Sequence, residues 1–98
     1  SSIDERLRVI ATKAGLDRLI RETSIGTNRW RTVLYNKEIR ISTNEVEEIT
    51  KIFPQYAYWI TTGQIIPTAG QVSPDYEDLQ GMAKIRTTTQ AVKNQVKS

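Results

Sequence analysis

The chain has 98 residues, 38% of them hydrophobic and 26% charged, which is typical of one small globular domain with a modest core. It contains no cysteine and no histidine, which excludes disulfides, thiolate zinc sites and the commonest general base. We therefore expect a protein of the reducing cytoplasm with no enzyme activity, no cofactor and no metal. No apolar run approaches the roughly 18 residues of a membrane span, so no membrane association is expected.

The net charge of +3 is unevenly distributed along the chain. Residues 27–41 carry four basic residues and one acid, residues 42–79 carry one base and six acids, and residues 80–98 carry four bases and no acid. Segregated charge of this kind predicts oriented surfaces, with a basic patch in the middle of the chain and a basic tail.

Two helices are predicted in the first part of the chain. Ser2 is followed three residues later by Glu5, a capping-box pattern, and apolar residues at helical spacing continue to Gly15, which can end a helix. A second, short helix is predicted for residues 17–23, and residues 24–26 (Ser-Ile-Gly) form a turn. The inward side of the second helix is expected to consist of Leu16, Leu19 and Ile20.

Residues 27–35 are predicted to form a third helix. Trp30, Val33 and Leu34 stand at positions i, i+3 and i+4 and therefore form one apolar stripe. This periodicity favours Trp30 as a core residue over the alternative, an exposed stacking platform. A buried Trp30 is expected to direct Arg29 and Arg31 outward, where arginines are either solvated or bound to a ligand.

Two further helices are predicted between residues 42 and 63. Ser42 and Glu45 form a second capping box, and Pro54 ends that helix and can begin the next. The next helix stops at Gly63. Its aromatic residues are expected to pack within the domain as structural residues. The alternative is that their exposed parts form a dimer contact. These aromatic residues are Tyr56, Tyr58 and Trp59.

Residues 64–74 are predicted to connect the helices above to a last helix, which Ser73 caps and Pro74 opens. That helix carries a heptad-like seam, which predicts pairing with a second copy; the alternative is that the helix folds back onto its own domain. The seam consists of Met82, Ile85, Thr89, Val92 and Val96. The basic residues of the tail are expected to be a solvated face, a second DNA contact or an unstructured end. They are Lys84, Arg86, Lys93 and Lys97.

These elements predict an all-α fold of five compact helices followed by a separable sixth. We expect a domain at residues 1–66, a connecting segment at residues 67–74 and a C-terminal helix at residues 75–98.

The stretches "TSIGTNRWRTVL" (residues 23–34) and "YAYWITTG" (residues 56–63) resemble the helix-turn-helix domains of lambdoid phage repressors. The resemblance is to the Cro/repressor type and to related small bacterial regulators, and it covers roughly residues 3–66. Two positions depart from that pattern. Ser24 stands where the tight turn usually carries glycine, and Ile20 stands where a small residue is usual, which predicts slightly wider spacing of the motif helices.

The resemblance implies that the helix at residues 27–35 enters the major groove of DNA. Its base-facing positions would be Thr27, Asn28 and Thr32, flanked by Arg29 and Arg31. Asparagine can bond adenine, arginine can bond guanine, and threonine offers a hydroxyl and a methyl group. For Asn28, hydrogen bonding to the backbone at the helix start is the alternative. In the loop that follows, Lys37 and Arg40 would contact phosphates.

The chain is thus interpreted as a sequence-specific DNA-binding regulator, a dimeric repressor on a palindromic operator. Concentration, proteolysis or a protein antagonist is expected to control it. The alternative is a protein-interaction module, antitoxin-like or inhibitory, whose working surface is the acidic segment at residues 42–79 together with the tail.

Overall fold

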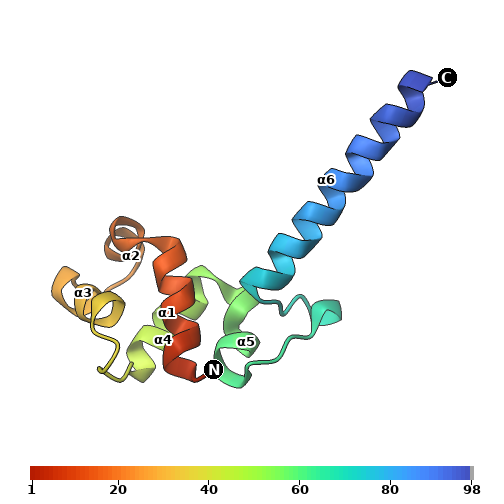
Figure 1. Ribbon diagram of the computed structural model, residues 1–98. Helices are drawn as coiled ribbons and strands as arrows, with labels where there is room; N and C mark the ends of the chain where they lie inside the picture. Colours follow the sequence, from red (N-terminus) through yellow and green to blue (C-terminus); the bar gives the residue numbers. More distant parts are fainter. Residues whose placement is uncertain (98) are drawn as a thin grey trace.

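The computed structural model describes residues 1–97, with side chains for residues 1–85. The helices are α1 (Ile3–Ala14), α2 (Leu16–Glu22), α3 (Thr27–Tyr35), α4 (Thr43–Ile52), η1 (Pro54–Tyr56), α5 (Ala57–Thr62), η2 (Pro67–Ala69) and α6 (Pro74–Lys97). Within residues 1–97 the only extended pairing is an isolated bridge between Ile66 and Gln71. The predicted all-α class is confirmed. The helices α1 to α5 form a body from which α6 projects (Figure 1).

Helix boundaries follow the local sequence. The hydroxyl of Ser2 accepts the backbone N–H of Glu5 at 3.2 Å, which caps α1 as predicted. Gly63 ends α5 with φ 77°, a left-handed conformation that favours glycine. A side chain at that position would also place its Cβ 3.2 Å from the guanidinium of Arg6.

The core lies between α1, α3, α4 and α5. Trp30 is fully buried, and its indole Nε1 donates a hydrogen bond to the hydroxyl of Thr23 at 2.8 Å. The prediction that Trp30 belongs to the core is confirmed, and so is the burial of Tyr56. The other buried hydrophobic residues are Leu7, Ile10, Ala11, Leu19, Ile25, Val33, Ile49 and Ile60.

The prediction for Ile20 is wrong. Its side chain is 36% exposed, whereas Leu19 is fully buried. Adjacent residues on a helix point about 100° apart, and in α2 it is Leu19 that faces the core. The wider spacing of α2 and α3 stays a prediction.

The segment between α5 and α6 is tied to the body by hydrogen bonds. The backbone N–H of Val72 donates to the carbonyl of Gln55 at 2.9 Å. The side chain of Gln71 accepts the N–H of Tyr58 at 2.9 Å and donates to the carbonyl of Pro54 at 3.1 Å. These bonds fix where α6 begins.

Helix α6 starts as predicted, because the hydroxyl of Ser73 accepts the backbone N–H of Tyr76 at 3.1 Å. Near this start, burial raises the pKa of the Tyr56 hydroxyl to about 12, with a contribution from the adjacent Glu77 carboxylate. Lys13 of α1 forms an exposed ion pair with Asp78 at 3.8 Å.

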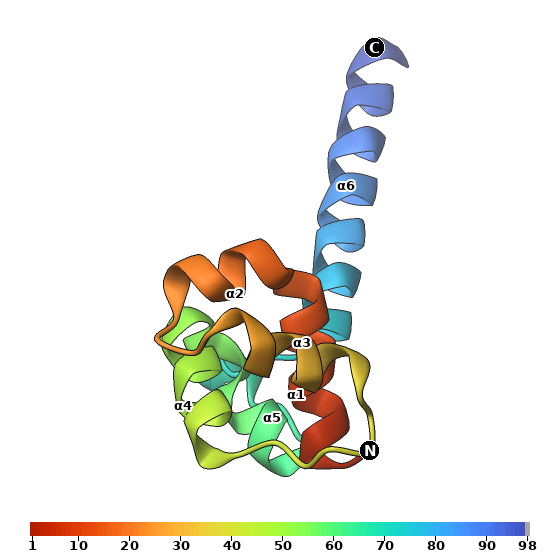
Figure 2. The same ribbon diagram turned by 90° about the vertical axis from the view of Figure 1, so that its left-hand side faces the viewer.

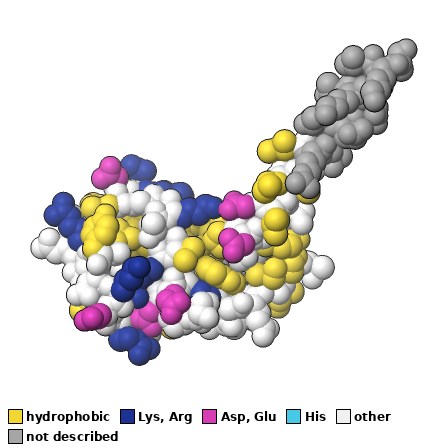
Figure 3. All heavy atoms as spheres, viewed as in Figure 1, with side chains coloured by type: hydrophobic (Ala, Val, Ile, Leu, Met, Phe, Trp, Pro, Cys, Tyr) yellow, Lys and Arg dark blue, Asp and Glu magenta, His cyan; other side chains and the backbone are white. Residues whose placement is uncertain are grey.

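Beyond its first turns α6 leaves the body, so the fold-back alternative does not describe this structure (Figures 1 and 2). Hydrophobic side chains gather over its base and the adjoining body (Figure 3). Leu79, Met82 and Ile85 are each more than half exposed. The other predicted residues of the seam and of the basic tail lie outside the described side chains. They are Arg86, Thr89, Val92, Lys93, Val96 and Lys97.

No helix in the described part of the chain combines the length and the apolar character needed to cross a membrane.

Candidate nucleic-acid interface

Helix α3 has one buried face and one exposed face. Trp30 and Val33 are fully buried, whereas Asn28, Arg31 and Tyr35 are exposed. The exposed residues recur at helical spacing and therefore line one side of the helix. The helix lies at the end of the body opposite to α6, so its outer side is open (Figures 1 and 2).

The polar side chains on this face have few partners. The hydroxyl of Thr32 donates to the carbonyl of Asn28 at 3.0 Å, within the helix, and both Thr27 and Thr32 are half-buried. Among the described residues, none is hydrogen-bonded to the side chain of Asn28 or Arg31. The alternative in which Asn28 bonds the backbone at the helix start is therefore not seen, and Gly26 occupies the N-cap.

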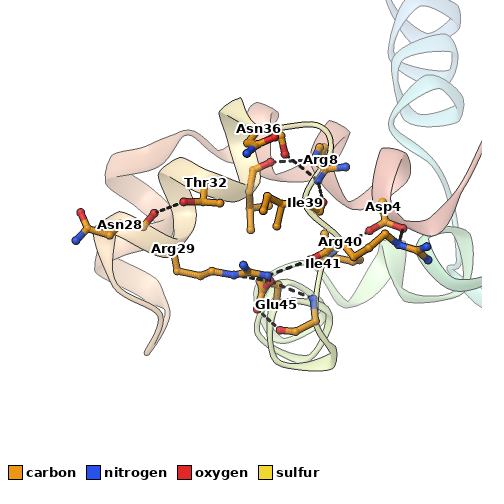
Figure 4. Close-up of polar contacts among 12 residues, drawn as sticks. Asp4, Arg8, Asn28, Arg29, Thr32, Asn36, Ile39, Arg40, Ile41 and Glu45 are labelled. Atoms are coloured by element: carbon orange, nitrogen blue, oxygen red, sulfur yellow. Dashed lines mark hydrogen bonds and ion pairs between the residues drawn. The ribbon is translucent and has the colours of Figure 1, made fainter.

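Arg29 departs from the prediction that it points outward. Its Nε and one terminal nitrogen donate to the same carboxylate oxygen of Glu45, at 3.0 and 2.6 Å (Figure 4). The terminal nitrogen also donates to the carbonyl of Arg40 at 3.2 Å. Glu45 is only 2% exposed, and a buried carboxylate without a partner is strongly unfavourable, so it draws the guanidinium inward.

Glu45 also accepts hydrogen bonds from the backbone N–H of Ser42, at 3.1 Å, and from its hydroxyl. The predicted capping box at the start of α4 is thus confirmed, and Arg29 is an additional member of it. Burial tends to raise the pKa of Glu45. The hydrogen bonds from Ser42 and Arg29 outweigh burial and hold the pKa below its ordinary value.

A second acid of α4 holds the turn between α2 and α3. The backbone N–H of Ser24 donates to the Glu48 carboxylate at 3.3 Å, and the Ser24 hydroxyl donates to the same oxygen. These bonds, chiefly the one from the hydroxyl, lower the pKa of Glu48. Serine in place of the usual glycine therefore gives the turn a tie to α4.

The loop between α3 and α4 is anchored by α1 (Figure 4). Arg8 donates from Nε to the carbonyl of Val33 at 2.8 Å, and its terminal nitrogen donates to the carbonyls of Asn36, at 3.3 Å, and Ile39. Cations that bond the last carbonyls of a helix also interact favourably with its dipole. Arg8 thus fixes both the end of α3 and the loop.

Asp4 provides the other anchor. Its carboxylate accepts the backbone N–H of Ile41 at 2.7 Å and the Nε of Arg40 at 3.1 Å. The Ile41 N–H is the main reason that the pKa of Asp4 lies below its ordinary value, and the charge of Arg40 adds to it. Arg40 is nevertheless 84% exposed in its side chain, and Lys37 is exposed as well.

Asp4 and Arg8 shape this region, and neither residue is predicted from the sequence to do so. Both occupy α1, more than 20 residues from their partners, and both are buried despite their charge. A capping box and helical periodicity give no information about partners at such separation.

The arrangement offers hydrogen-bond donors and cations. Arg31, Lys37 and Arg40 supply positive charge on α3 and the loop, and Asn28 supplies an amide. An open groove of about 660 Å³ lies between α1 and the end of α3, beside Val9 and Leu34. In residues 1–85, no three or more His, Cys, Asp or Glu side chains are grouped so that they could hold a metal ion.

No protein-family model matches the chain, and no curated protein matches it. Among solved structures, it is similar to Pf6r from the filamentous phage Pf6 of Pseudomonas aeruginosa PA01, with 48% sequence identity and a TM-score of 0.73. The aligned region covers 76% of this chain and 97% of that chain. Identity at this level over almost all of Pf6r indicates common descent. The chain therefore belongs to the same protein family as Pf6r.

Proposed function

We propose that this protein is a sequence-specific DNA-binding regulator, a phage repressor of the Cro/repressor type. In this proposal α2 and α3 form a helix-turn-helix motif, and α3 enters the major groove. The observation that carries it is the exposed face of α3, where Asn28 and Arg31 stand without partners among the described residues while Trp30 anchors the opposite face. Membership of a family that includes a phage protein supports a phage regulatory role.

The proposed contacts follow from side-chain chemistry. Arg31 can donate two hydrogen bonds to guanine, Asn28 can pair with adenine, and Thr27 and Thr32 can contact neighbouring bases. The first N–H groups of α3 and its dipole favour a phosphate near the helix start. Lys37 and Arg40 fix the register through phosphates. No catalytic step is assigned to any residue.

We further propose that the protein acts as a homodimer on a palindromic operator in the cytoplasm. Residues 1–66 would carry the DNA surface, residues 67–74 would connect, and residues 75–98 would pair with a second copy. Support comes from the exposed apolar side chains of Leu79, Met82 and Ile85. Helices in proteins gain most of their stability by packing an apolar face, so the exposure of these three side chains favours a partner for α6. Occupancy of the operator would exclude polymerase or a competing regulator.

Selection of bound duplexes from a random pool, with the solution mass measured in parallel, tests this function. The expected result is enrichment of a palindromic sequence by a protein of dimeric mass, with affinity that falls steeply as salt rises. No enrichment, together with affinity that does not respond to salt, would contradict the proposal. A stoichiometric protein partner found under those circumstances would favour the interaction-module alternative.

A further inference from the structure

Two arginines flank Trp30 on α3, and the structure treats them differently. Arg31 is exposed, and no described residue is bonded to its guanidinium. Arg29 is bonded through two nitrogens to Glu45 and through one of them to the carbonyl of Arg40 (Figure 4). Both arginines lie on the helix proposed to enter DNA, so the difference in their hydrogen bonds to the protein should affect DNA binding.

We infer that Glu45 is a positioning residue that holds Arg29 off the DNA, so that α3 makes one phosphate contact fewer than its sequence would allow. The inference rests on the proposed function. Arg29 then serves to fix α3 against α4 and the loop, and the contact with DNA falls to Arg31 and its neighbours on the exposed face.

The geometry favours Glu45 over a phosphate as the partner of Arg29. The donor–acceptor distances are 3.0 and 2.6 Å, and hydrogen bonds between two charged groups at such distances are among the strongest in proteins. Glu45 is 2% exposed, whereas a DNA phosphate is solvated and screened by salt. Moving Arg29 to a phosphate would leave a buried carboxylate without its cation, which is strongly unfavourable.

Arg40 and Asp4 form a second arginine–carboxylate pair at the same surface, which can be compared with Arg29 and Glu45. Arg40 donates only its Nε to Asp4, at 3.1 Å, and its side chain is 84% exposed, against 38% for Arg29. The terminal nitrogens of Arg40 therefore remain available to a phosphate without breaking the pair. Neutralising Asp4 should free no additional cation, whereas neutralising Glu45 should free Arg29.

The test compares Glu45→Gln with Asp4→Asn, since both remove one negative charge close to the proposed interface. Glutamine at position 45 still suits a capping box, so α4 keeps its start. The probes are a duplex selected by the wild-type protein and an unrelated duplex of equal length, titrated by fluorescence anisotropy at several salt concentrations.

For Glu45→Gln we expect the slope of log Kobs against log salt to steepen by about 0.9 on both duplexes, the value for one phosphate contact. In the double variant Glu45→Gln/Arg29→Ala the slope should return to that of the wild type. Asp4→Asn should leave the slope unchanged, and Arg29→Ala in the wild-type background should not reduce it.

A slope for Glu45→Gln equal to that of the wild type or of Asp4→Asn would overturn the inference. So would a slope reduced by about 0.9 in Arg29→Ala, because Arg29 would then already contact a phosphate. If the wild-type protein itself binds without salt dependence, the proposed function fails instead.

If the variants do not fold, a nuclear magnetic resonance measurement on the unaltered protein tests the inference. The Nε–H resonance of Arg29 should keep its position when the selected duplex is added, while that of Arg31 moves. A large shift at Arg29 upon binding would contradict the inference.

Discussion

The body and helix α6 differ in how far their apolar side chains are buried. In the body Leu7, Trp30 and Ile49 are fully buried, whereas on α6 Leu79, Met82 and Ile85 are more than half exposed. Burial of apolar surface is the main source of folding stability. These three side chains of the body thus contribute to folding stability, whereas those on α6 remain available for a contact with another molecule.

The polar contacts within the body also differ from those between the body and α6. In the body Arg6 bonds the carbonyl of Ile60 at 2.9 Å, Arg8 bonds the end of α3, and Arg29 bonds Glu45. Between α6 and α1 there is an exposed ion pair of Lys13 with Asp78, and such pairs contribute little. Changes in the body should therefore alter folding or DNA contact, and changes on α6 should alter assembly.

The largest effect is expected from truncating Trp30. Trp30→Ala removes a fully buried side chain and its hydrogen bond to Thr23, and should lower the free energy of unfolding by about 3–5 kcal/mol. Urea denaturation followed by circular dichroism measures this. The control Tyr35→Ala, on the exposed face of the same helix, should stay within about 0.5 kcal/mol. Equal losses in both variants would refute the assigned orientation of α3.

A triple change on α6 should affect assembly and not the body. Leu79→Ser, Met82→Ser and Ile85→Ser together remove the exposed stripe, and should convert a dimer to a monomer in analytical ultracentrifugation. Affinity for a palindromic duplex should fall roughly 100-fold, since two linked half-site contacts become one. Gln80→Ala, a polar position on the same helix, serves as the control. A triple variant that keeps the wild-type mass would exclude α6 as the dimer contact.

Arg31→Ala should weaken binding to a selected duplex by about 1–3 kcal/mol and relax preference at one base pair. Competition titrations with single-base variants of that duplex measure both quantities. The exposed cation Lys51 of α4 supplies a comparison, and Lys51→Ala should leave preference at every base pair unchanged. Loss of affinity in Arg31→Ala without any change in preference would reassign Arg31 to a phosphate.

The smallest expected effect is on the pH dependence of stability. It reports on the charged contacts of the body and not on its apolar core. The pKa values of Asp4 and Glu45 are lowered by folding, from ordinary values of 3.8 and 4.5. Their stabilising contribution is present above those values and is lost as pH falls through the folded values. Unfolding free energy should therefore decline below about pH 4.5, and less so in Asp4→Asn. Identical acid profiles for that variant and the wild type would argue against the Asp4 contacts.

Features that depend on neighbours in the chain could be predicted from the sequence. The caps at Ser2, Ser42 and Ser73, the end of α5 at Gly63 and the buried stripe of Trp30 all involve residues within about one helical turn, and all are confirmed.

Features that depend on partners distant in the chain could not be predicted from the sequence. Arg29 was expected outward because periodicity describes only α3, whereas its orientation is decided by a buried carboxylate 16 residues away. Asp4 and Arg8 act on the end of α3 and the loop after it, 25 to 37 residues away, and nothing in α1 marks them. Charge pattern identified a basic segment but did not reveal which of its cations are already neutralised.

The most direct test of the central claim is an anisotropy titration of a selected duplex with the double variant Asn28→Ala/Arg31→Ala. Both side chains are exposed on α3, so the variant should fold like the wild type. Its affinity should fall to that for unrelated DNA while circular dichroism stays unchanged. Binding of the selected duplex at wild-type affinity would show that the outer face of α3 does not read DNA.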